Sequence, residues 1–292
     1  MKGIILAGGA GSRLYPLSLV ASKQLQHVYD KPMIYYPLST LIECGIRDIA
    51  IITTPEDAPT FKRLLARSSE WGVNLTFLEQ DKPRGLAEAY IIAEQFIDNQ
   101  PSMLILGDNI FSSAKPIRDA LMNDRWTNTG AICFAYPVSD PERYGIVTLG
   151  PGGDVVSLIE KPFNSVSNLA IPGVYICDGW APYIAKTLVP SFRGELEIIH
   201  LLHAYQLKNA IECYKLPRGF AWLDAGTSSS LHDSAAYIQT IEHRCGIKLG
   251  CPEEAAFNAG AMTLDALNIY SHSLPTCDYR TYLRKIVLSH SA

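Results

Sequence analysis

The first hundred or so residues alternate between short apolar runs and longer segments in which apolar residues recur every three or four positions. Short runs of this kind predict β-strands, and the longer segments predict α-helices. The expected strands are residues 2–7, 48–53, 74–78 and 102–106, and the expected helices are residues 33–44, 58–66 and 86–96. Strands that alternate with helices are typical of a parallel sheet covered by helices on both faces.

The pattern changes after residue 108. Residues 132–136, 146–149, 155–159 and 170–177 are strand-like, and we expect them to extend the sheet and to add a smaller, partly antiparallel substructure over its edge. Residues 227–242 have apolar positions at helical spacing, and the tail from residue 252 onward reads as helical. The pattern therefore predicts an α/β fold, with a main domain over residues 1–250 and a helical appendage over residues 251–292.

Composition removes several classes of protein. Of the 292 residues, 48% are hydrophobic and 18% are charged, which is too apolar for intrinsic disorder. The net charge of −4 gives no clustered excess of base for a nucleic-acid partner. The apolar runs fall far short of the roughly 20 residues that a membrane span needs, and glycines interrupt the N-terminus too early for a secretion signal. The seven cysteines form no C-x-x-C pair, so we expect free thiols in a cytoplasmic protein.

A glycine-rich loop follows the first predicted strand. Gly8, Gly9 and Gly11 allow backbone N–H groups to approach a ligand closely, and Arg13 and Lys23 supply cations suited to a polyphosphate. The loop is not a Walker A sequence, which needs a lysine directly after a glycine. It is not a dinucleotide-binding sequence either, because leucine stands where that pattern has its third glycine. The alternative is a tight strand-to-helix turn beside two surface bases.

Two aspartates lie next to the ends of predicted elements. Asp108 lies just beyond the strand 102–106, where α/β sheets bind their ligands. Asp224 precedes the helix that begins near Thr227. If the two side chains meet at the sheet edge, they can hold one hard divalent cation such as Mg²⁺ together with phosphate oxygens. The alternatives are an ordinary Asp-Asn turn at residue 108 and a helix-start acid at residue 224.

Two further segments have side chains suited to a sugar phosphate and to a base. Glu160 can accept hydrogen bonds from sugar hydroxyls, and Lys161 can neutralise a monophosphate. Gln80 can read a base edge through its paired donor and acceptor, and Gly85 would let a base lie against the backbone. A surface ion pair and a plain turn are the respective alternatives.

Together these segments resemble the sugar nucleotidyltransferases, and among them the family that makes dTDP-glucose. The resemblance rests on LAGGAGSRL (6–14), SKQ (22–24), DKPMIYYPLS (30–39), GLA (85–87), LGDNI (106–110), DPERYG (140–145), EKP (160–162), RGELEI (193–198), WLDAGT (222–227) and CPEEA (251–255), so it covers nearly the whole chain. It implies a Rossmann-like nucleotidyltransferase core with a mostly parallel central sheet, a sugar-binding part over about residues 111–221, and a C-terminal appendage that makes oligomer or effector contacts.

The resemblance also implies an activity and a set of roles. The activity is the Mg²⁺-dependent condensation of dTTP with α-D-glucose 1-phosphate to dTDP-glucose and pyrophosphate, in a homotetramer inhibited by a dTDP-sugar end product. Arg13, Lys23, Lys161 and Asp108 would be catalytic, and Asp108 and Asp224 would bind the metal. The nucleotide-binding residues would be Gly8, Gly9, Gly11, Ser12, Arg13, Gln24, Gln80, Pro83 and Gly85. The sugar-binding residues would be Asn109, Tyr144, Gly145, Glu160, Lys161, Ile171 and Glu197.

The chain departs from the usual family pattern at several positions. The family usually has Thr-Asp at Ile199-His200, Asn at Leu202 and Thr at Ala225. We expect His200 to alter the charge near the sugar pocket. Three alternatives remain open: a uridylyltransferase that uses UTP, a catalytically weak relative that binds nucleotide sugar, and an NAD-dependent dehydrogenase, which Leu14 disfavours.

Overall fold

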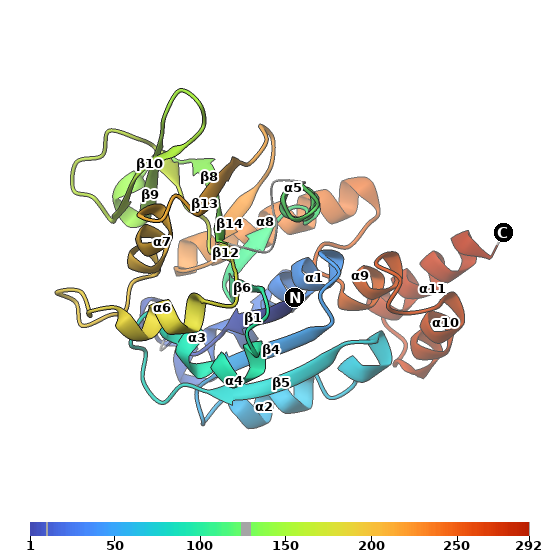
Figure 1. Cartoon of the computed structure of the whole chain (residues 1–292). Coiled ribbons are helices and arrows are strands. Elements are labelled where there is room, and N and C mark those ends of the chain that lie inside the picture. The colour runs from blue at the N-terminus through green and yellow to red at the C-terminus, as the bar shows by residue number, and fades with distance from the viewer. Residues whose placement is uncertain (10, 124–129, 292) are drawn as a thin grey trace.

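The computed structural model describes residues 1–9, 11–123 and 130–291. Ala10 of the predicted glycine-rich loop, residues 124–129 of the predicted sugar-binding part and the last residue of the predicted appendage lie outside the described residues. The strands of the main sheet are β1 (Lys2–Leu6), β4 (Asp48–Thr53), β5 (Asn74–Glu79), β6 (Ser102–Leu106), β8 (Ala131–Pro137), β9 (Gly145–Leu149), β10 (Val155–Glu160), β11 (Leu169–Ala170), β12 (Val174–Cys177) and β13 (Ile211–Lys215). Their order is β10-β9-β11-β8-β12-β6-β1-β4-β5, with β13 paired to β8 (Figure 1).

The predicted parallel core is confirmed in the order β6-β1-β4-β5. Within it β1 pairs parallel to both β4 and β6, and β4 pairs parallel to β5. The chain runs outward from β1 through β4 to β5 and then returns to the other side of β1 as β6. The point between β1 and β6 is therefore a topological switch point, where the loops after the two strands diverge and leave a crevice.

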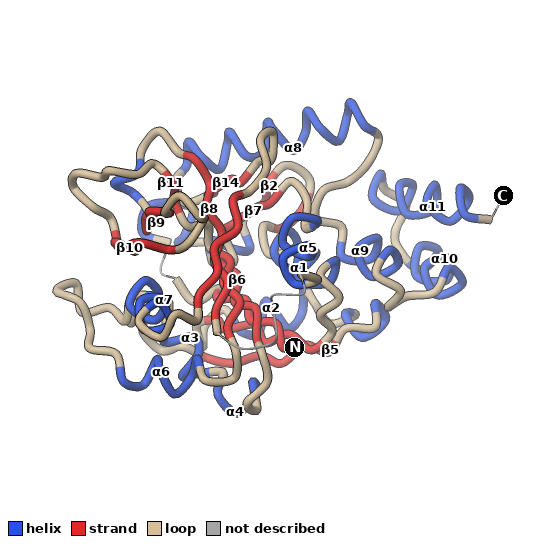
Figure 2. Tube along the Cα trace, turned by 45° about the horizontal axis from the view of Figure 1, so that its top comes forward, coloured by secondary structure: helices blue, strands red, loops and turns tan. Residues whose placement is uncertain are grey.

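Helices cover both faces of this core. They are α1 (Tyr35–Glu43), α2 (Ala58–Leu64), α3 (Glu88–Ile92), α4 (Glu94–Ile97), α5 (Lys115–Leu121), α6 (Ala181–Thr187), α7 (Ile198–Gln206), α8 (Ser228–Cys245), α9 (Pro252–Asn258), α10 (Leu264–Ser273) and α11 (Asp278–His290). Figure 2 shows α1, α5 and α9 on one side of the strands and α3, α6 and α7 on the other. Alternate residues of β1 serve the two layers, because Ile5 packs in the cluster of α1 and Ile4 packs in the cluster of α3 and α6.

The antiparallel part continues the same sheet. β12 pairs antiparallel to β6 and β8, and β9, β10 and β11 form further antiparallel pairs. The single strand predicted over residues 170–177 is wrong, because the chain forms β11 and β12 with a break at Ile171, Pro172 and Gly173. Pro172 has no N–H to donate, so a proline in the middle of a run ends the ladder there.

The helix predicted over residues 86–96 is also corrected. It begins later, at Glu88, after Gly85, which has a left-handed φ of 108°. Ala87 caps the helix, and its N–H, which has no partner within a helix, donates to the carbonyl of Leu196. It is then divided at Ala93 into α3 and α4. Residues 86–87 thus serve a contact with a segment remote in sequence, which local periodicity cannot report.

Two small ladders complete the fold. β2 (His27–Val28) pairs with β3 (Lys31–Pro32), and β7 (Asn109–Phe111) pairs with β14 (Trp222–Asp224). The predicted helix after residue 227 is α8, and Thr227 caps it by accepting from the N–H of Ser230. The second ladder brings the chain around Asp224 beside the chain around Asp108.

The helical tail is confirmed as α9, α10 and α11. α9 packs on α1 and α10 packs on α11, at the opposite end of the molecule from β9, β10 and α7 (Figure 1). All seven cysteines are free thiols. Among the described residues, no helix combines the length and the apolar character that crossing a membrane requires.

Candidate active site

The glycine-rich loop leaves the carboxyl end of β1 directly beside the turn that follows β6. The N–H of Gly107 donates to the carbonyl of Leu6 over 2.9 Å, which joins the two loops at the switch point. Gly11 has a left-handed φ of 59°, a conformation that glycine adopts without a steric penalty. Backbone amides at such a loop are suited to an anion, because no side chain stands between them and the ligand.

Gln80 lies over this loop from the end of β5. A Cβ added to Gly8 would stand 2.7 Å from Oε1 of Gln80, so glycine at this position lets the amide approach the loop. Nε2 of the buried Gln80 donates to Glu88 at 2.7 Å. Glycine is needed at position 85 for a different reason, because a Cβ there would stand 2.4 Å from the backbone of Leu196. Contact of Gln80 and Gly85 with a base stays a prediction.

Lys23 forms an ion pair with Asp108 at the same edge. Lys23 lies in the short 3₁₀ helix Lys23–Leu25 and is 7% exposed. Burial alone raises the pKa of Asp108, but the charge and hydrogen bond of Lys23 outweigh it and hold this pKa below its ordinary value. Gln24 is buried beside it and accepts from the hydroxyl of Ser22 at 2.9 Å.

Asp224 reaches the same place from the far end of the chain. β14 pairs antiparallel to β7 with Asp224 opposite Asn109, and the N–H of Ala225 donates to the carbonyl of Asp108 at 3.2 Å. Burial and the negative charge of Asp108 raise the pKa of Asp224. Arg143 lies 3.6 Å from its carboxylate. The two aspartates therefore repel each other across a small gap, which is the condition that a bound cation relieves.

The opposite half of the site is built around Gly145. A Cβ there would stand 2.6 Å from Cδ1 of Ile199 and 3.3 Å from Oε2 of Glu160, so a larger residue would displace the Ile199 side chain. Burial raises the pKa of Glu160, against the lowering effect of Lys161. Lys161 has a left-handed φ of 44°, which is a strained backbone for a residue with a side chain. Its N–H donates to the carbonyl of Tyr144 at 3.0 Å, and Nζ lies 3.4 Å from Glu160.

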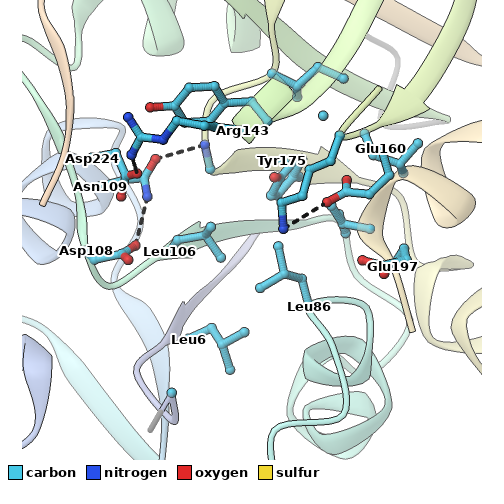
Figure 3. A pocket seen from close by; sticks show the side chains of 18 of the residues that line it. Leu6, Leu86, Leu106, Asp108, Asn109, Arg143, Glu160, Tyr175, Glu197 and Asp224 are labelled. Carbon is cyan, nitrogen blue, oxygen red and sulfur yellow. Dashed lines mark hydrogen bonds and ion pairs between the residues drawn. The ribbon is translucent and has the colours of Figure 1, made fainter. Parts of the chain in front are cut away.

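These groups surround one cavity of about 590 Å³. Figure 3 shows Asp108, Asn109 and Asp224 at one end and Glu160 and Glu197 at the other. The predicted residues that line it are Gly9, Arg13, Gln24, Asp108, Asn109, Tyr144, Gly145, Glu160, Lys161, Ile171, Glu197 and Asp224. The predicted residues that do not line it are Gly8, Gly11, Ser12, Lys23, Gln80, Pro83 and Gly85.

Sequence reasoning assigned no role to three charged residues that line the cavity. Arg193 lies 3.1 Å from Glu197, 2.5 Å from Glu195 and 3.9 Å from Glu160, so one guanidinium holds three carboxylates. Arg143 and Glu195 also line the cavity. Their only signal in the sequence was membership of the DPERYG and RGELEI segments, because neither spacing nor periodicity marks them.

The departures from the family pattern fall in different environments. Ile199 is 3% exposed and lines the cavity. His200 is exposed and is not among the residues that line the cavity, so its effect on the charge near the sugar pocket stays a prediction. Leu202 and Ala225 are fully buried in two hydrophobic clusters, so apolar packing accounts for them. Only Ile199 of this set bears on the surface offered to a ligand.

The described residues gather no group of three or more acidic, imidazole or thiol side chains that could hold a metal ion by themselves. Two carboxylates nevertheless suit a hard divalent cation such as Mg²⁺, which usually takes one or two protein carboxylates and completes its coordination with phosphate and water oxygens. Asp108 and Asp224 fit this requirement, because both line the cavity and the chain has brought like charges together there.

Comparison with known proteins gives consistent relatives. The chain is 47% identical to a glucose-1-phosphate thymidylyltransferase of Xanthomonas campestris pv. campestris, over 97% of this chain and 95% of that protein. It is 46% identical to one of Mycolicibacterium smegmatis, over 98% and 99% of the two chains. A Bacillus anthracis protein solved with sucrose superposes with a TM-score of 0.75 at 38% identity, over 81% of this chain and 94% of that one.

A structure with lower sequence identity shares the same fold. A UDP-glucose pyrophosphorylase in complex with UDP-glucose superposes with a TM-score of 0.71 at 22% identity, over 82% of this chain and 98% of that one, which shows a shared fold. Residues 2–241 match the profile of the nucleotidyl transferase family. With a switch-point crevice, a glycine-rich loop and paired aspartates on one cavity, and with these relatives along nearly its full length, the chain belongs to the nucleotidyl transferase family and, within it, to the glucose-1-phosphate thymidylyltransferases.

Proposed function

We propose that the chain condenses dTTP with α-D-glucose 1-phosphate to form dTDP-glucose and pyrophosphate, as the first step of dTDP-sugar biosynthesis. The observation that carries the proposal is that Asp108 and Asp224 line the same cavity as Arg13, Glu160 and Lys161. A polyphosphate at the glycine-rich end and a sugar phosphate at the other end would then meet beside the paired carboxylates. The names of the close relatives support the choice of substrates.

The reaction needs no general base. A phosphate oxygen of glucose 1-phosphate forms a bond to the α-phosphorus of dTTP, and the bond from that phosphorus to the bridging oxygen of pyrophosphate breaks. The attacking dianion is already deprotonated, so the chain has to bring two polyanions together and neutralise the charge that develops. Arg13 and Lys23 would do this on the pyrophosphate side, and Lys161 would do it beside the sugar phosphate.

Asp108 and Asp224 are the residues that would hold Mg²⁺. When it is bound, the cation neutralises charge on the phosphate oxygens of the nucleotide. Lys23 would have two roles in this arrangement. It balances the charge of Asp108 in the ligand-free protein, and its own charge is suited to a phosphate. The repulsion that raises the pKa of Asp224 would be relieved by any divalent cation shared with Asp108.

The remaining predicted residues divide between the two halves of the substrate. Gly8, Gly9, Gly11 and Ser12 would contact the triphosphate, and Gln80 and Gly85 would read the base. Gln24 and Pro83 would make further contacts with the nucleotide. The sugar would be surrounded by Asn109, Tyr144, Gly145, Glu160, Ile171 and Glu197. The side chain of Glu197 is already held by Ser191 at 2.8 Å and by Arg193, which would orient it toward a hydroxyl.

We also propose a homotetramer inhibited by a dTDP-sugar end product, with catalytic domain 1–250 and appendage 251–292 as separate functional parts. A second cavity of about 280 Å³ between α1 and residues 247–259 supports an effector contact at the appendage. Seven free cysteines support a reducing compartment, the cytoplasm.

A pyrophosphate-release assay over a matrix of nucleotides and sugar 1-phosphates tests the function. We expect turnover with dTTP and glucose 1-phosphate, and its loss when Mg²⁺ is withheld. UTP differs from dTTP by the missing methyl group of thymine and by the added 2′-hydroxyl of the ribose. The methyl group alone is worth about 1–3 kcal/mol in a pocket, so UTP should be about 10-fold or more slower. Faster turnover with UTP would replace the thymidylyl assignment, and no pyrophosphate from any pair of substrates would refute the enzymatic one.

A further inference from the structure

We propose that Trp222 and Asn109 are positioning residues that hold Asp108 in the orientation in which it binds a divalent cation. The inference rests on the proposed function, since it assumes that Asp108 is a metal ligand. Asn109 is 3% exposed although it lines the cavity. Its side chain is therefore held mostly by the protein, and its partners identify what it does.

The oxygen of the Asn109 amide is saturated. Oδ1 accepts from Nε1 of Trp222 at 2.6 Å and from the backbone N–H of Gly173 at 3.0 Å. A carbonyl oxygen has two lone pairs, so both are used. Rotating the amide by half a turn would set its NH₂ group against two N–H donors. The two donors thus fix which end of the amide faces which way.

The fixed amide points its nitrogen at Asp108. Nδ2 of Asn109 donates to Oδ1 of Asp108 at 2.8 Å, while Oδ2 of Asp108 pairs with Lys23. The terminal torsion of an aspartate is broad, so a carboxylate without such a donor turns easily. With Oδ1 held by Asn109, the plane of the carboxylate stays set when Lys23 exchanges its partner for a phosphate.

Trp222 is itself immobilised. It lies in β14 opposite Phe111 of β7, and its ring makes edge contacts with Tyr136 at 5.6 Å and Tyr144 at 5.1 Å between centroids. A Cβ on Gly173 would stand 2.8 Å from Oδ1 of Asn109 and 2.6 Å from Leu106, so this donor also requires glycine. Both donors to Asn109 are therefore built into the fold, and Figure 3 shows Asn109 beside Asp108 and Asp224.

Trp222→Phe removes the indole N–H and keeps an aromatic ring, and Tyr136→Phe is the matched control. Tyr136 touches the same indole, but its hydroxyl donates to the carbonyl of Phe220 and not toward Asp108. Mn²⁺ binding is measured by electron paramagnetic resonance on the full chain with dTTP and without sugar phosphate. Loss of a residue that orients a metal ligand typically lowers metal affinity or activity about 10–100-fold.

We expect Trp222→Phe to weaken Mn²⁺ binding by about 10-fold or more and to lower kcat with little change in the KM for glucose 1-phosphate. Asn109→Ala should weaken Mn²⁺ binding further, because it removes the donor to Oδ1 of Asp108 itself and not only the group that orients this donor. Tyr136→Phe should leave Mn²⁺ binding unchanged.

Unchanged Mn²⁺ binding in a folded Trp222→Phe variant would overturn the proposal, and a rise in the KM for glucose 1-phosphate alone would make Trp222 a sugar contact instead. The binding arm is independent of turnover. Weakened Mn²⁺ binding in a protein that releases no pyrophosphate supports the positioning role while refuting the proposed function.

Discussion

Two groups of buried charges behave in opposite ways in this molecule. In the cavity, Asp108 and Asp224 lie close to each other, and the pKa of Asp224 is raised by burial and by Asp108. Away from the cavity, a quartet of charges consists of the buried Lys31 and Glu242, the half-buried Lys248 and the more exposed Asp30. Lys31 lies 2.8 Å from Glu242 and 2.5 Å from Asp30, and Lys248 pairs with both carboxylates, at 3.0 Å from Glu242.

The quartet is complete without a ligand. Burial alone would raise the pKa of Asp30, but the hydrogen bonds from Lys248 and Lys31 outweigh it and lower this pKa. Burial likewise opposes the charge of Lys248, yet Asp30 and Glu242 raise its pKa. Each carboxylate here lies between two ammonium groups. The quartet joins the β2–β3 hairpin, the end of α8 and the segment before α9, and Lys248 also lines the cavity of about 280 Å³ between α1 and residues 247–259.

The comparison teaches that the same charges serve stability or chemistry according to whether the protein itself supplies the counter-ions. In the quartet the opposite charges come from the chain. In the cavity Asp224 has the like charge of Asp108 as its neighbour. The charges of Lys23, Arg13 and Arg143 do not outweigh this charge and burial, so the pKa of Asp224 stays raised. Removing a charge should therefore have different consequences in the two places.

The largest effect is expected for Asp224→Asn. If Asp224 holds the metal as proposed, its loss should lower kcat/KM for pyrophosphate release at least about 1000-fold, or roughly 4 kcal/mol. The same change removes a repulsion, so the free energy of unfolding at pH 8 should stay level or rise. Urea unfolding measures this quantity, and the exposed Asp233→Asn in α8 is the control. A clear loss of stability together with full activity would mean that Asp224 serves stability and not chemistry, which is the opposite of this prediction.

The converse is expected for Glu242→Gln in the quartet. Removing one partner from a buried charge cluster typically lowers the free energy of unfolding by about 3–5 kcal/mol, because the remaining charges stay buried with too few counter-ions. Glu242 is 6% exposed and does not line the cavity that holds Asp108 and Asp224, so the folded fraction should keep its kcat. The exposed Glu56→Gln serves as the control in urea unfolding. Wild-type stability in the quartet variant would contradict this picture.

A smaller effect tests burial by itself. Burial, together with the charge of Glu254, raises the pKa of Glu43 in α1 to about 7, against lowering contributions from the N–H of Ala114 and from Arg118. Because the folded pKa lies above the ordinary 4.5, this group's contribution to stability is full below pH 4.5 and is lost as the pH rises through about 7.

Glu43→Gln should therefore raise the free energy of unfolding by about 2–3 kcal/mol at pH 8.5 and leave it unchanged at pH 4. Urea unfolding across this range gives the difference, with Glu56→Gln again as the control. A difference in stability that does not depend on pH would mean that Glu43 keeps its ordinary pKa. Burial would then not be enough to raise the pKa of this carboxylate.

Much of this organisation could be predicted from the sequence. The period of apolar residues located the parallel strands, α1, α8 and the helical tail, and the motif segments identified the family. The errors came where remote contacts override local pattern. The N–H of Ala87 donates to the carbonyl of Leu196 where the helix was predicted to run, and α3 begins only at Glu88. Pro172 divides one apolar run into the two strands β11 and β12. His200 sat next to cavity residues in sequence, but helix α7 turns it outward to solvent.

The candidate site was predictable as a set of residue types but not as a set of partners. Nothing local indicates that Arg193 holds Glu160, Glu195 and Glu197, or that Trp222 donates to Asn109. Such pairs join different elements, and their distance depends on strand order and register. The individual roles of the site residues stay predictions until the experiments above are done.

The amino-acid order by itself determined the fold class, the glycine-rich loop and the kinds of side chain available, because steric preference and apolar periodicity act between near neighbours. Only the tertiary structure decided that the chain around Asp224 lies beside the chain around Asp108, and that Lys23 and not solvent balances the latter. Electrostatic energy depends on distance and burial, and these two quantities exist only once the sheet has formed.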